Sequence, residues 1–293
     1  MSSATVLIGL STLFSGLILG SVFALVAAGV TIVYGSIWLP NAANGQFFLL
    51  GGLLAWSLIT SFGISPLLAS LAVLLFGIVF AYLIEATLIR RFYDTPDRNI
   101  AYFVLTLGVT QVLSGIFSIT YGQWSDQYNI PPIIGGMTMI GPFPLANNRL
   151  VVLAISIGLL VALFVLLKHH PYGRALRAVF QNREAAALRG VDVRGIYRLS
   201  FVLGTAVIFA GGLLFGAAFS FDLTVAWNMA ITAFAIMIVG GPGSVLGAVV
   251  VGMVFGFTQA IVSVFASPTI ATFAYLLAML LILLVKPAGL FAR

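Results

Sequence analysis

The sequence contains few charged residues and no cysteine. Only 7% of its 293 residues are Asp, Glu, Lys or Arg, whereas about a quarter of the residues in an ordinary soluble domain are charged. The absence of cysteine excludes disulfides, thiol catalysis and thiolate metal sites. The two histidines, His169 and His170, are adjacent, so they cannot form a metal site on one helix face or supply the buried base of an intramembrane serine protease. We therefore expect no catalytic residue and no metal site.

The sequence is rich in apolar residues. They make up 61% of the chain, and its mean hydropathy is +1.18. Residues 1–84 and 223–285 contain no charged residue, and each stretch is longer than the roughly 20 residues that one transmembrane helix needs. The composition predicts an all-α integral membrane protein whose single transmembrane domain covers residues 1–293. It excludes a soluble enzyme, a nucleic-acid-binding protein and a disordered chain.

The apolar residues form separate segments, from which we expect about eight or nine transmembrane helices. The segments are 5–39, 47–59, 66–89, 100–120, 150–167, 199–219, 227–239, 245–265 and 269–285. The first is too long for one simple crossing, and segment 227–239 is short. Either of them could be broken or re-entrant, which leaves the number of crossings open by one.

Basic residues concentrate in three segments. Residues 90–98, 168–198 and 286–293 hold 12 of the 13 Lys and Arg residues. Because basic loops stay in the cytoplasm, we expect all three, including the C-terminus, to be cytoplasmic. The connection 121–149 then faces outside, and its prolines and glycines predict that turns order it. The net charge of +6 is therefore a topology signal and does not indicate nucleic-acid binding.

Residues 40–46 interrupt otherwise continuous apolar sequence with a proline, two asparagines, a glycine and a glutamine. Non-helical backbone at membrane depth is tolerated only where it is buried in protein or lines a wet cavity, and interrupted helices often mark the route through a transporter. The composition of residues 40–46 is equally compatible with an ordinary loop at the membrane interface. We predict a solute route lined by Asn41, Asn44, Gln46, Phe47, Phe48 and Trp227.

The basic segment 168–198 also contains a structured element. Residues 173–190 have the composition of one Ala-rich helix of strong helix formers that ends at Gly190. Asp192 can then cap a following helix. Such a helix suits docking into a groove of a soluble partner, and a helix that lies on the membrane surface is the alternative.

Glu85 is an ionisable residue inside a predicted membrane helix. It lies about one turn from Arg90 and Arg91, with which we expect a structural ion pair. A proton-coupling role is the alternative, because carriers place an ionisable group near the middle of the membrane.

Four segments carry a family resemblance. They are 20–35, 173–190 with the Glu-Ala-Ala core at 184–186, the glycine-rich turn 240–248, and the tail 286–291. Together, and in this order, they resemble the permease family of the branched-chain amino-acid ABC importers, the LivH-like group. The matching segments span nearly the whole chain.

The resemblance implies a permease subunit of an ATP-driven importer in the bacterial inner membrane, for branched-chain amino acids or similar small polar solutes. It implies a second homologous permease, two cytoplasmic ATPases that bind ATP and Mg²⁺, and a periplasmic binding protein that delivers the solute. We expect the outside connection 121–149, with its aromatic residues and prolines, to help receive that binding protein. It also makes 168–198 the loop that couples the permease to the ATPases, through Arg174, Arg177, Arg183, Glu184, Ala185, Ala186 and Gly190. The chain has no phosphate-binding glycine loop, so we expect it to hold no cofactor.

The sequence departs from the family at two places that concern the solute. Residues 41–46 read Asn-Ala-Ala-Asn-Gly-Gln, where the family usually has a string like Asn-Phe-Ala-His-Gly-Glu. Gln259 stands where the family often has a glutamate. Urea, short amides and aromatic carboxylates therefore remain alternative solutes. A secondary carrier is a further alternative, but no inverted repeat or mid-membrane charge is visible.

Overall fold

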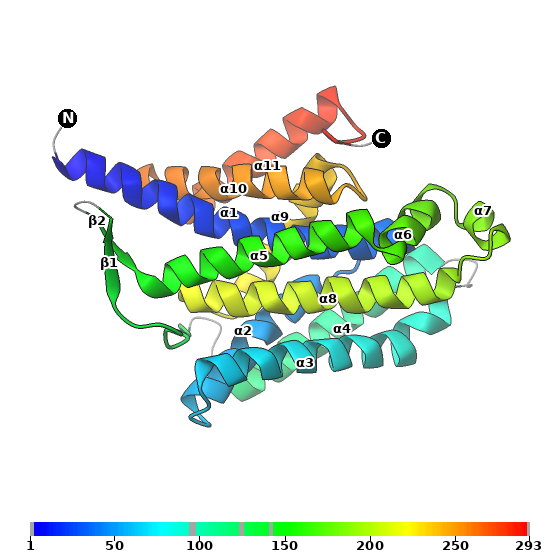
Figure 1. Cartoon of the computed structure of the whole chain (residues 1–293), viewed down its shortest axis with the longest axis horizontal. Coiled ribbons are helices and arrows are strands. Elements are labelled where there is room, and N and C mark those ends of the chain that lie inside the picture. The colour runs from blue at the N-terminus through cyan, green and yellow to red at the C-terminus, as the bar shows by residue number, and fades with distance from the viewer. Residues whose placement is uncertain (1–2, 94–97, 123–125, 141–142, 292–293) are drawn as a thin grey trace.

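The computed structural model describes residues 3–93, 98–122, 126–140 and 143–291. In these residues each predicted apolar segment is a helix, which confirms the all-α fold class (Figure 1). The helices are α1 (Ser3–Ile37), α2 (Asn44–Thr60), α3 (Pro66–Ile84), α4 (Arg98–Tyr121), α5 (Asn147–His169), α8 (Val193–Ala218), α9 (Val225–Gly240), α10 (Val245–Phe265) and α11 (Pro268–Val285).

Shorter elements complete the chain. A π-helical turn (Glu85–Ile89) and a 3-10 turn (Arg90–Phe92) continue α3, and α6 (Pro171–Gln181) and α7 (Arg183–Leu188) lie between α5 and α8. Strands β1 (Met137–Ile140) and β2 (Phe143–Ala146) pair antiparallel, with Met137 opposite Ala146. This hairpin belongs to the connection 121–149, of which residues 123–125 and 141–142 lie outside the described residues.

Seven helical spans of the described residues are long and apolar enough to cross a membrane, and α9 is a shorter apolar helix. The long first run is one continuous helix, α1, rather than two. The short run 227–239 becomes the 16-residue helix α9. Helix α2 has 17 residues, because the chain leaves helical geometry between Ile37 and Asn44.

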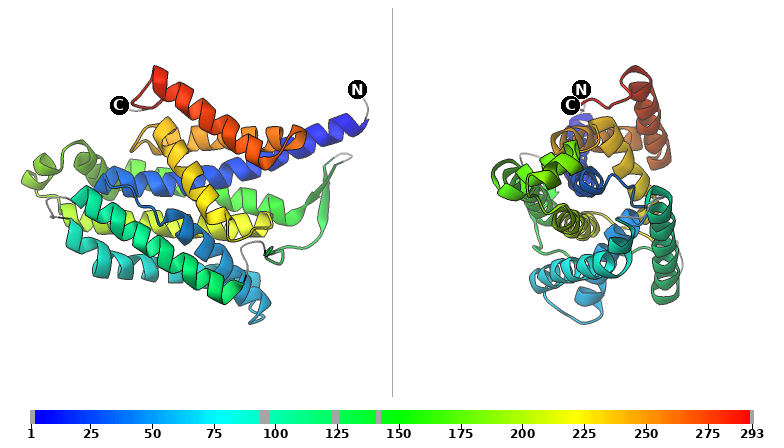
Figure 2. Two further views of the ribbon diagram at one scale, coloured as in Figure 1. Left: turned by 180° about the vertical axis from the view of Figure 1, so that it is seen from behind. Right: turned by 90° about the vertical axis from the view of Figure 1, so that its right-hand side faces the viewer.

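The two ends of the bundle carry different elements (Figures 1 and 2). One end carries α6, α7 and the 3-10 turn after α3, and the last turn of α11 points toward it. The start of α1 and the β1–β2 hairpin lie at the opposite end. The basic segments thus gather at a single end, as the positive-inside bias produces. We call the two ends the basic end and the hairpin end.

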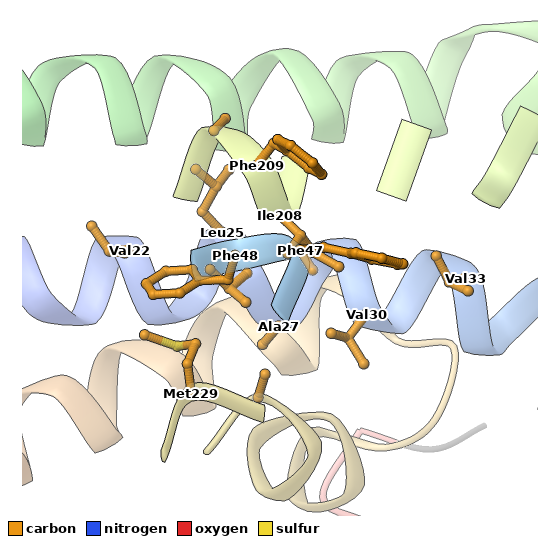
Figure 3. Close-up of a cluster of buried hydrophobic side chains, with 14 of the residues drawn as sticks. Val22, Leu25, Ala27, Val30, Val33, Phe47, Phe48, Ile208, Phe209 and Met229 are labelled. Carbon is orange, nitrogen blue, oxygen red and sulfur yellow. The ribbon is translucent and has the colours of Figure 1, made fainter. Parts of the chain in front are cut away.

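Helix α1 is the centre of the bundle. In its most apolar window 89% of the residues are buried within the chain, against 17% for α5 and 11% for α11. Val22, Leu25 and Val33 of α1 pack in a cluster with residues of α2, α8 and α9 (Figure 3). Helices α5 and α11 therefore lie at the periphery, where their apolar side chains suit contact with lipid.

Small residues let the central helices approach closely. A Cβ on Gly256 of α10 would lie 2.1 Å from Gly20 Cα of α1, and a Cβ on Gly212 of α8 would lie 1.8 Å from the carbonyl oxygen of Phe48 in α2. Helices in a membrane gain little from the hydrophobic effect against each other, so close van der Waals packing of this kind holds them together.

Candidate functional site

The polar side chains at the break between α1 and α2 are buried in protein. Asn41 Oδ1 accepts a hydrogen bond from Ala43 N at 3.0 Å, which forms the turn that leads into α2. The N–H of Ala42 donates to Thr106 Oγ1 of α4 at 3.2 Å. Asn41, Asn44 and Gln46 are each 2% exposed. The backbone break therefore meets the condition for non-helical structure at membrane depth, because the surrounding protein supplies part of its hydrogen bonding.

Several polar atoms around this break are buried without a hydrogen-bond partner. They are Asn41 Nδ2, both polar side-chain atoms of Asn44, Gln46 Oε1 and Tyr102 Oη. An unsatisfied buried polar group costs roughly 1–3 kcal/mol. A polar solute or water that reached these atoms would therefore gain hydrogen bonds that the protein alone leaves unmade.

Helix α4 faces the break with a row of hydroxyl groups. Tyr102, Thr106, Thr110 and Ser114 recur at every fourth residue, so they share one side of the helix. Gln46 Nε2 donates to Ser114 Oγ at 2.9 Å. We call this contact between the amides at residues 41–46 and the hydroxyl row of α4 the α2–α4 seam.

Phe47 and Phe48 follow the break and belong to the aromatic core. Phe47 lies 5.6 Å from Phe80 and Phe48 lies 5.5 Å from Phe215, measured between ring centroids. Both side chains are 1% exposed and point into the cluster beside α1 and α8 (Figure 3). Trp227, by contrast, is 41% exposed on α9. The structure therefore brings five of the six predicted route residues together and places Trp227 on the outside of the chain.

A cavity of about 760 Å³ opens near the hairpin end, within the size range of small-molecule sites. Helices α1, α9, α10 and α11, the end of α8 and the α8–α9 connection surround it. Its polar wall consists mainly of the hydroxyls and amides of Ser11, Thr12, Ser15, Asn228, Thr232, Gln259, Ser263, Thr272 and Tyr275. Its apolar wall includes Leu19, Phe23, Phe215, Met229 and Leu276. Among the described lining residues Asp222 alone carries a charge.

Hydrogen bonds order the polar wall of the cavity. The hydroxyls of Thr232 and Tyr275 are 2.8 Å apart, and the ring of Tyr275 stacks on Phe255 with a centroid distance of 4.8 Å. Gln259 Nε2 donates to the Pro268 carbonyl at 3.3 Å, while Gln259 Oε1 has no partner. Among the uncharged polar residues of this wall, the sequence pattern indicated only Gln259. The other polar residues of the wall are mostly isolated serines and threonines in charge-free runs. Their positions in the sequence do not reveal which helices meet, so they could not be assigned to one site.

The cavity and the α2–α4 seam are neighbours. Gly45 lies between the buried residues Asn44 and Gln46 in the sequence, and it packs against the first turn of α9. A Cβ on Gly45 would lie 2.0 Å from Ala226 O. Asn228 and Met229 of the same region of α9 line the cavity. The start of α9 therefore forms the wall between them.

The basic segment 168–198 forms two helices, so the expectation of one continuous helix over 173–190 is wrong. Helix α6 ends at Gln181, and Asn182 takes an extended backbone conformation with φ −158°. Its side-chain oxygen accepts hydrogen bonds from Glu184 N and Ala185 N, each at 3.0 Å. Asn182 thus caps the start of α7 instead of continuing α6, because its side-chain oxygen takes the place of a backbone carbonyl as acceptor for these N–H groups.

The predicted boundaries after this break are confirmed. Gly190, just beyond α7, has a φ of +81°, which glycine adopts without a Cβ clash. Asp192 caps α8 by accepting from Gly195 N at 3.0 Å. The predicted coupling side chains Arg174, Arg177, Arg183, Glu184 and Ala185 are exposed, whereas Ala186 is buried.

Tyr172 fixes α6 to the bundle. Its hydroxyl lies 2.9 Å from Ser200 Oγ of α8. Burial raises the pKa of Tyr172 to about 12, although the hydrogen bond with Ser200 works in the opposite direction. The phenol therefore stays protonated at any physiological pH and acts as a permanent link between α6 and α8.

Comparison with known proteins gives a consistent result. The family model "Branched-chain amino acid transport system / permease component" matches residues 12–285. The Escherichia coli high-affinity branched-chain amino acid transport system permease protein LivH is 26% identical over 97% of this chain and 96% of its own length. The BraD permease protein of Pseudomonas aeruginosa gives the same identity and coverage. The probable LivH of Methanocaldococcus jannaschii is 27% identical over 87% of this chain and 82% of its own.

The chain belongs to this permease family. It is a membrane-embedded permease component of the ABC transport type and is not an enzyme. No solved structure matches it significantly.

Glu85 of the permease sits near the basic end, in the π-helical turn after α3. Its Oε2 lies 3.8 Å from Arg198 Nε of α8, so the structure corrects the expected partner from Arg90 or Arg91 to Arg198. Tyr93 Oη donates to Glu85 Oε1 at 3.1 Å. Burial and the neighbouring carboxylate raise the pKa of Tyr93. An ion pair that joins α3 to α8 near one end of the bundle does not resemble the mid-membrane charge of a proton-coupled carrier.

Proposed function

We propose that this permease is the solute-conducting subunit of an ATP-driven importer in the bacterial inner membrane. The basic end, with α6, α7 and the C-terminus, faces the cytoplasm, and the hairpin end faces the periplasm. A second homologous permease pairs with it, and two cytoplasmic ATPases that bind ATP and Mg²⁺ dock on α6 and α7. A periplasmic binding protein delivers the solute at the connection 121–149. The family membership and the gathering of basic residues at one end support this arrangement.

The placement of the cavity carries the proposal. It lies near the hairpin end, opposite α6 and α7, so the solute is received at one end and the ATPases act at the other. Hydroxyls and amides can bind a solute without holding it by charge, and weak binding lets the solute leave. The apolar residues Leu19, Met229 and Leu276 suit an aliphatic side chain.

The solute that best fits this wall is a zwitterionic or uncharged small molecule. The names of the relatives point to a branched-chain amino acid. An aromatic carboxylate fits less well, because Asp222 at the wall would repel an anion and no described lining side chain is a cation. Urea and short amides are uncharged and remain the second candidate, favoured by the neutral residues Gln46 and Gln259.

The inner part of the proposed route passes the α2–α4 seam. Solute that leaves the cavity crosses the first turn of α9 and meets Asn41, Asn44 and Gln46, with Phe47 and Phe48 as apolar neighbours. Trp227, on the exposed side of α9, would contribute from the surface that the second permease covers. In the conformation described here the amides are sealed, so this part of the route opens only with a change of conformation.

Reconstitution tests the proposal. The permease, its partner permease, the ATPases and the binding protein are placed in proteoliposomes, and uptake of labelled leucine is measured with and without ATP on the ATPase side. We expect ATP-dependent uptake that excess valine inhibits and benzoate does not. Uptake driven by an ion gradient without ATP would contradict the proposal, and inhibition by urea alone would select the second candidate.

A paired substitution tests the role of the cavity in the same assay. Thr232→Val combined with Tyr275→Phe removes the hydrogen-bonded hydroxyl pair from the wall and should lower leucine uptake. Thr258→Val is the matched control, because the Thr258 hydroxyl also bonds to a carbonyl of its own helix but does not line the cavity. Equal uptake by the paired variant and the control would remove the cavity from the route.

A further inference from the structure

Trp38 has an unusual backbone conformation. It is the one non-glycine residue with a positive φ among the described residues, at +58°. A bulky L-residue rarely adopts this conformation, and the surrounding structure must hold it there. Trp38 directly follows α1, and Pro40 and Asn41 of the break come next. The backbone at this residue therefore sets the direction in which the chain enters the α2–α4 seam.

An aromatic stack with α6 holds the side chain of Trp38. Its ring lies 4.8 Å from the ring of Phe180, measured between centroids, and the two planes differ by 11°. Tyr34, one turn earlier in α1, adds a tilted contact at 5.8 Å. Phe180 stands in the last turn of α6, two residues before the helix cap Asn182.

The same phenylalanine ring contacts the turn between α9 and α10. A Cβ on Gly243 would lie 2.5 Å from the Phe180 ring, and one on Gly35 of α1 would lie 3.5 Å from it. One side chain of α6 thus touches the end of α1 and the α9–α10 turn. We call the contact of Trp38, Phe180 and Gly243 the aromatic junction.

Packing alone does not explain this arrangement. Trp38 is 44% exposed, so its ring contributes less to the core than the buried aromatic residues of α2 and α8 do. Non-glycine residues that are held at a positive φ concentrate at functional sites and switch regions.

We propose that the aromatic junction transmits the displacement of α6 and α7 to the break at residues 38–43, and that Trp38 is the positioning residue. This inference rests on the proposed docking of the ATPases on α6 and α7. When α6 shifts, Phe180 leaves the indole ring and Trp38 loses the contact that holds its positive φ. Its backbone then relaxes, and the following segment with Asn41 turns relative to α4. In this proposal the stacked and the released junction are the two discrete arrangements that coupling between α6 and the break requires.

The absence of cysteine from the chain permits a direct measurement. Ala42→Cys places a single thiol in the break, and its reaction with a membrane-impermeant methanethiosulfonate reagent is followed in the reconstituted complex. We expect the reaction rate to change between the nucleotide-free complex and the complex with Mg²⁺ and a non-hydrolysable ATP analogue. Adding Trp38→Ala or Phe180→Ala should abolish that change, and each substitution should lower the number of leucine molecules transported per ATP by about three- to thirtyfold.

Two further variants separate the ring from the backbone. Trp38→Phe keeps an aromatic stack and should restore the nucleotide response. Trp38→Gly accepts the positive φ without strain but has no ring. It should therefore abolish the nucleotide response as Trp38→Ala does, and it tests the loss of the ring in a backbone that is not strained. Phe265→Ala removes an exposed aromatic at the other end of α10 and should leave the response unchanged.

The outcomes distinguish this inference from the proposed function. If the labelling rate still changes with nucleotide in both Trp38→Gly and Phe180→Ala, as it does in the wild type, the role of the junction is contradicted and the proposed function is unaffected. A complex whose thiol at position 42 ignores nucleotide would overturn the junction as well. A nucleotide response that these variants abolish, in a complex that takes up no leucine, would support the junction and contradict the proposed solute.

Discussion

Two buried asparagines of this permease show how differently one residue type is used. Asn148 at the start of α5 accepts a hydrogen bond from Ile133 N at 2.9 Å, and its Nδ2 donates to the carbonyl of Ala217. Asn44 at the start of α2 is more deeply buried, but both of its polar side-chain atoms lack partners. Asn148 therefore stabilises the fold, whereas Asn44 carries a free-energy cost that a function must explain.

This difference gives a prediction at the residue scale. Asn44→Leu should lower leucine uptake, because it removes a polar group from the proposed route, but it should leave the thermal stability of the complex unchanged or raised, because the unpaired buried amide is gone. Asn148→Leu should instead lower stability by about 1–3 kcal/mol, since it leaves the buried carbonyl of Ala217 and the partly buried N–H of Ile133 unpaired. Thermal unfolding in detergent and uptake in proteoliposomes measure the two effects. Normal uptake by Asn44→Leu would move the route away from the break.

At the scale of helices, glycines decide which pairs come close. The α1–α10 crossing places Gly20 against Gly256, and Gly252 lies against Ala24. Such spacings of small residues permit close backbone approach. They are common in membrane helices, so the sequence alone does not say which two helices use them.

We predict that Gly256→Ala destabilises the permease by about 1–3 kcal/mol, because its Cβ would force α1 and α10 apart. Gly108→Ala on α4 is the matched control, since a Cβ there meets nothing within 4 Å. Alanine in an exposed helix position is otherwise favourable, so the control should melt at the same temperature or higher. Equal melting temperatures for the two variants would contradict the described crossing.

The pair α6 and α7 gives a prediction about coupling. Replacing Arg183 and Glu184 by alanine should uncouple ATP hydrolysis from uptake, because both side chains are exposed on the helix that we expect to meet the ATPase. Insertion into the membrane should be unaffected. Gln181→Ala serves as the control, because it removes an exposed polar side chain at the end of α6. Wild-type solute-stimulated hydrolysis and transport in the double variant would show that α7 does not couple the two processes.

The whole molecule sets a topology that can be measured directly. The cysteine-free chain allows single thiols to be placed at opposite ends. Met139→Cys, at a 63% exposed position of β1, should react with an impermeant reagent only from the periplasmic side. Leu188→Cys, at a 90% exposed position of α7, should react only from the cytoplasmic side. Labelling of both thiols from one side would contradict the arrangement of the bundle.

Local sequence predicted most of the helices, because continuously apolar runs lack the alternation of a barrel strand and can cross a membrane only as helices. The caps at Gly190 and Asp192 were also predictable, since each depends on neighbouring residues alone. The break at Asn182 was not, because asparagine is compatible with both a helix and a cap. Only the hydrogen bonds to the backbone of residues 184 and 185 decide between them.

The sequence by itself therefore determined the membrane class, the family, the positions of the helices and the segregation of basic residues, since composition and short-range pattern encode these features. The tertiary structure decided which helices touch, and with that the cavity, which joins residues as distant as Ser15, Thr232 and Tyr275. It also decided that the amides at residues 41–46 are sealed against α4 and that Trp38 stacks on Phe180. The physical reason is that glycines and hydroxyls acquire their roles only from the helix that packs against them.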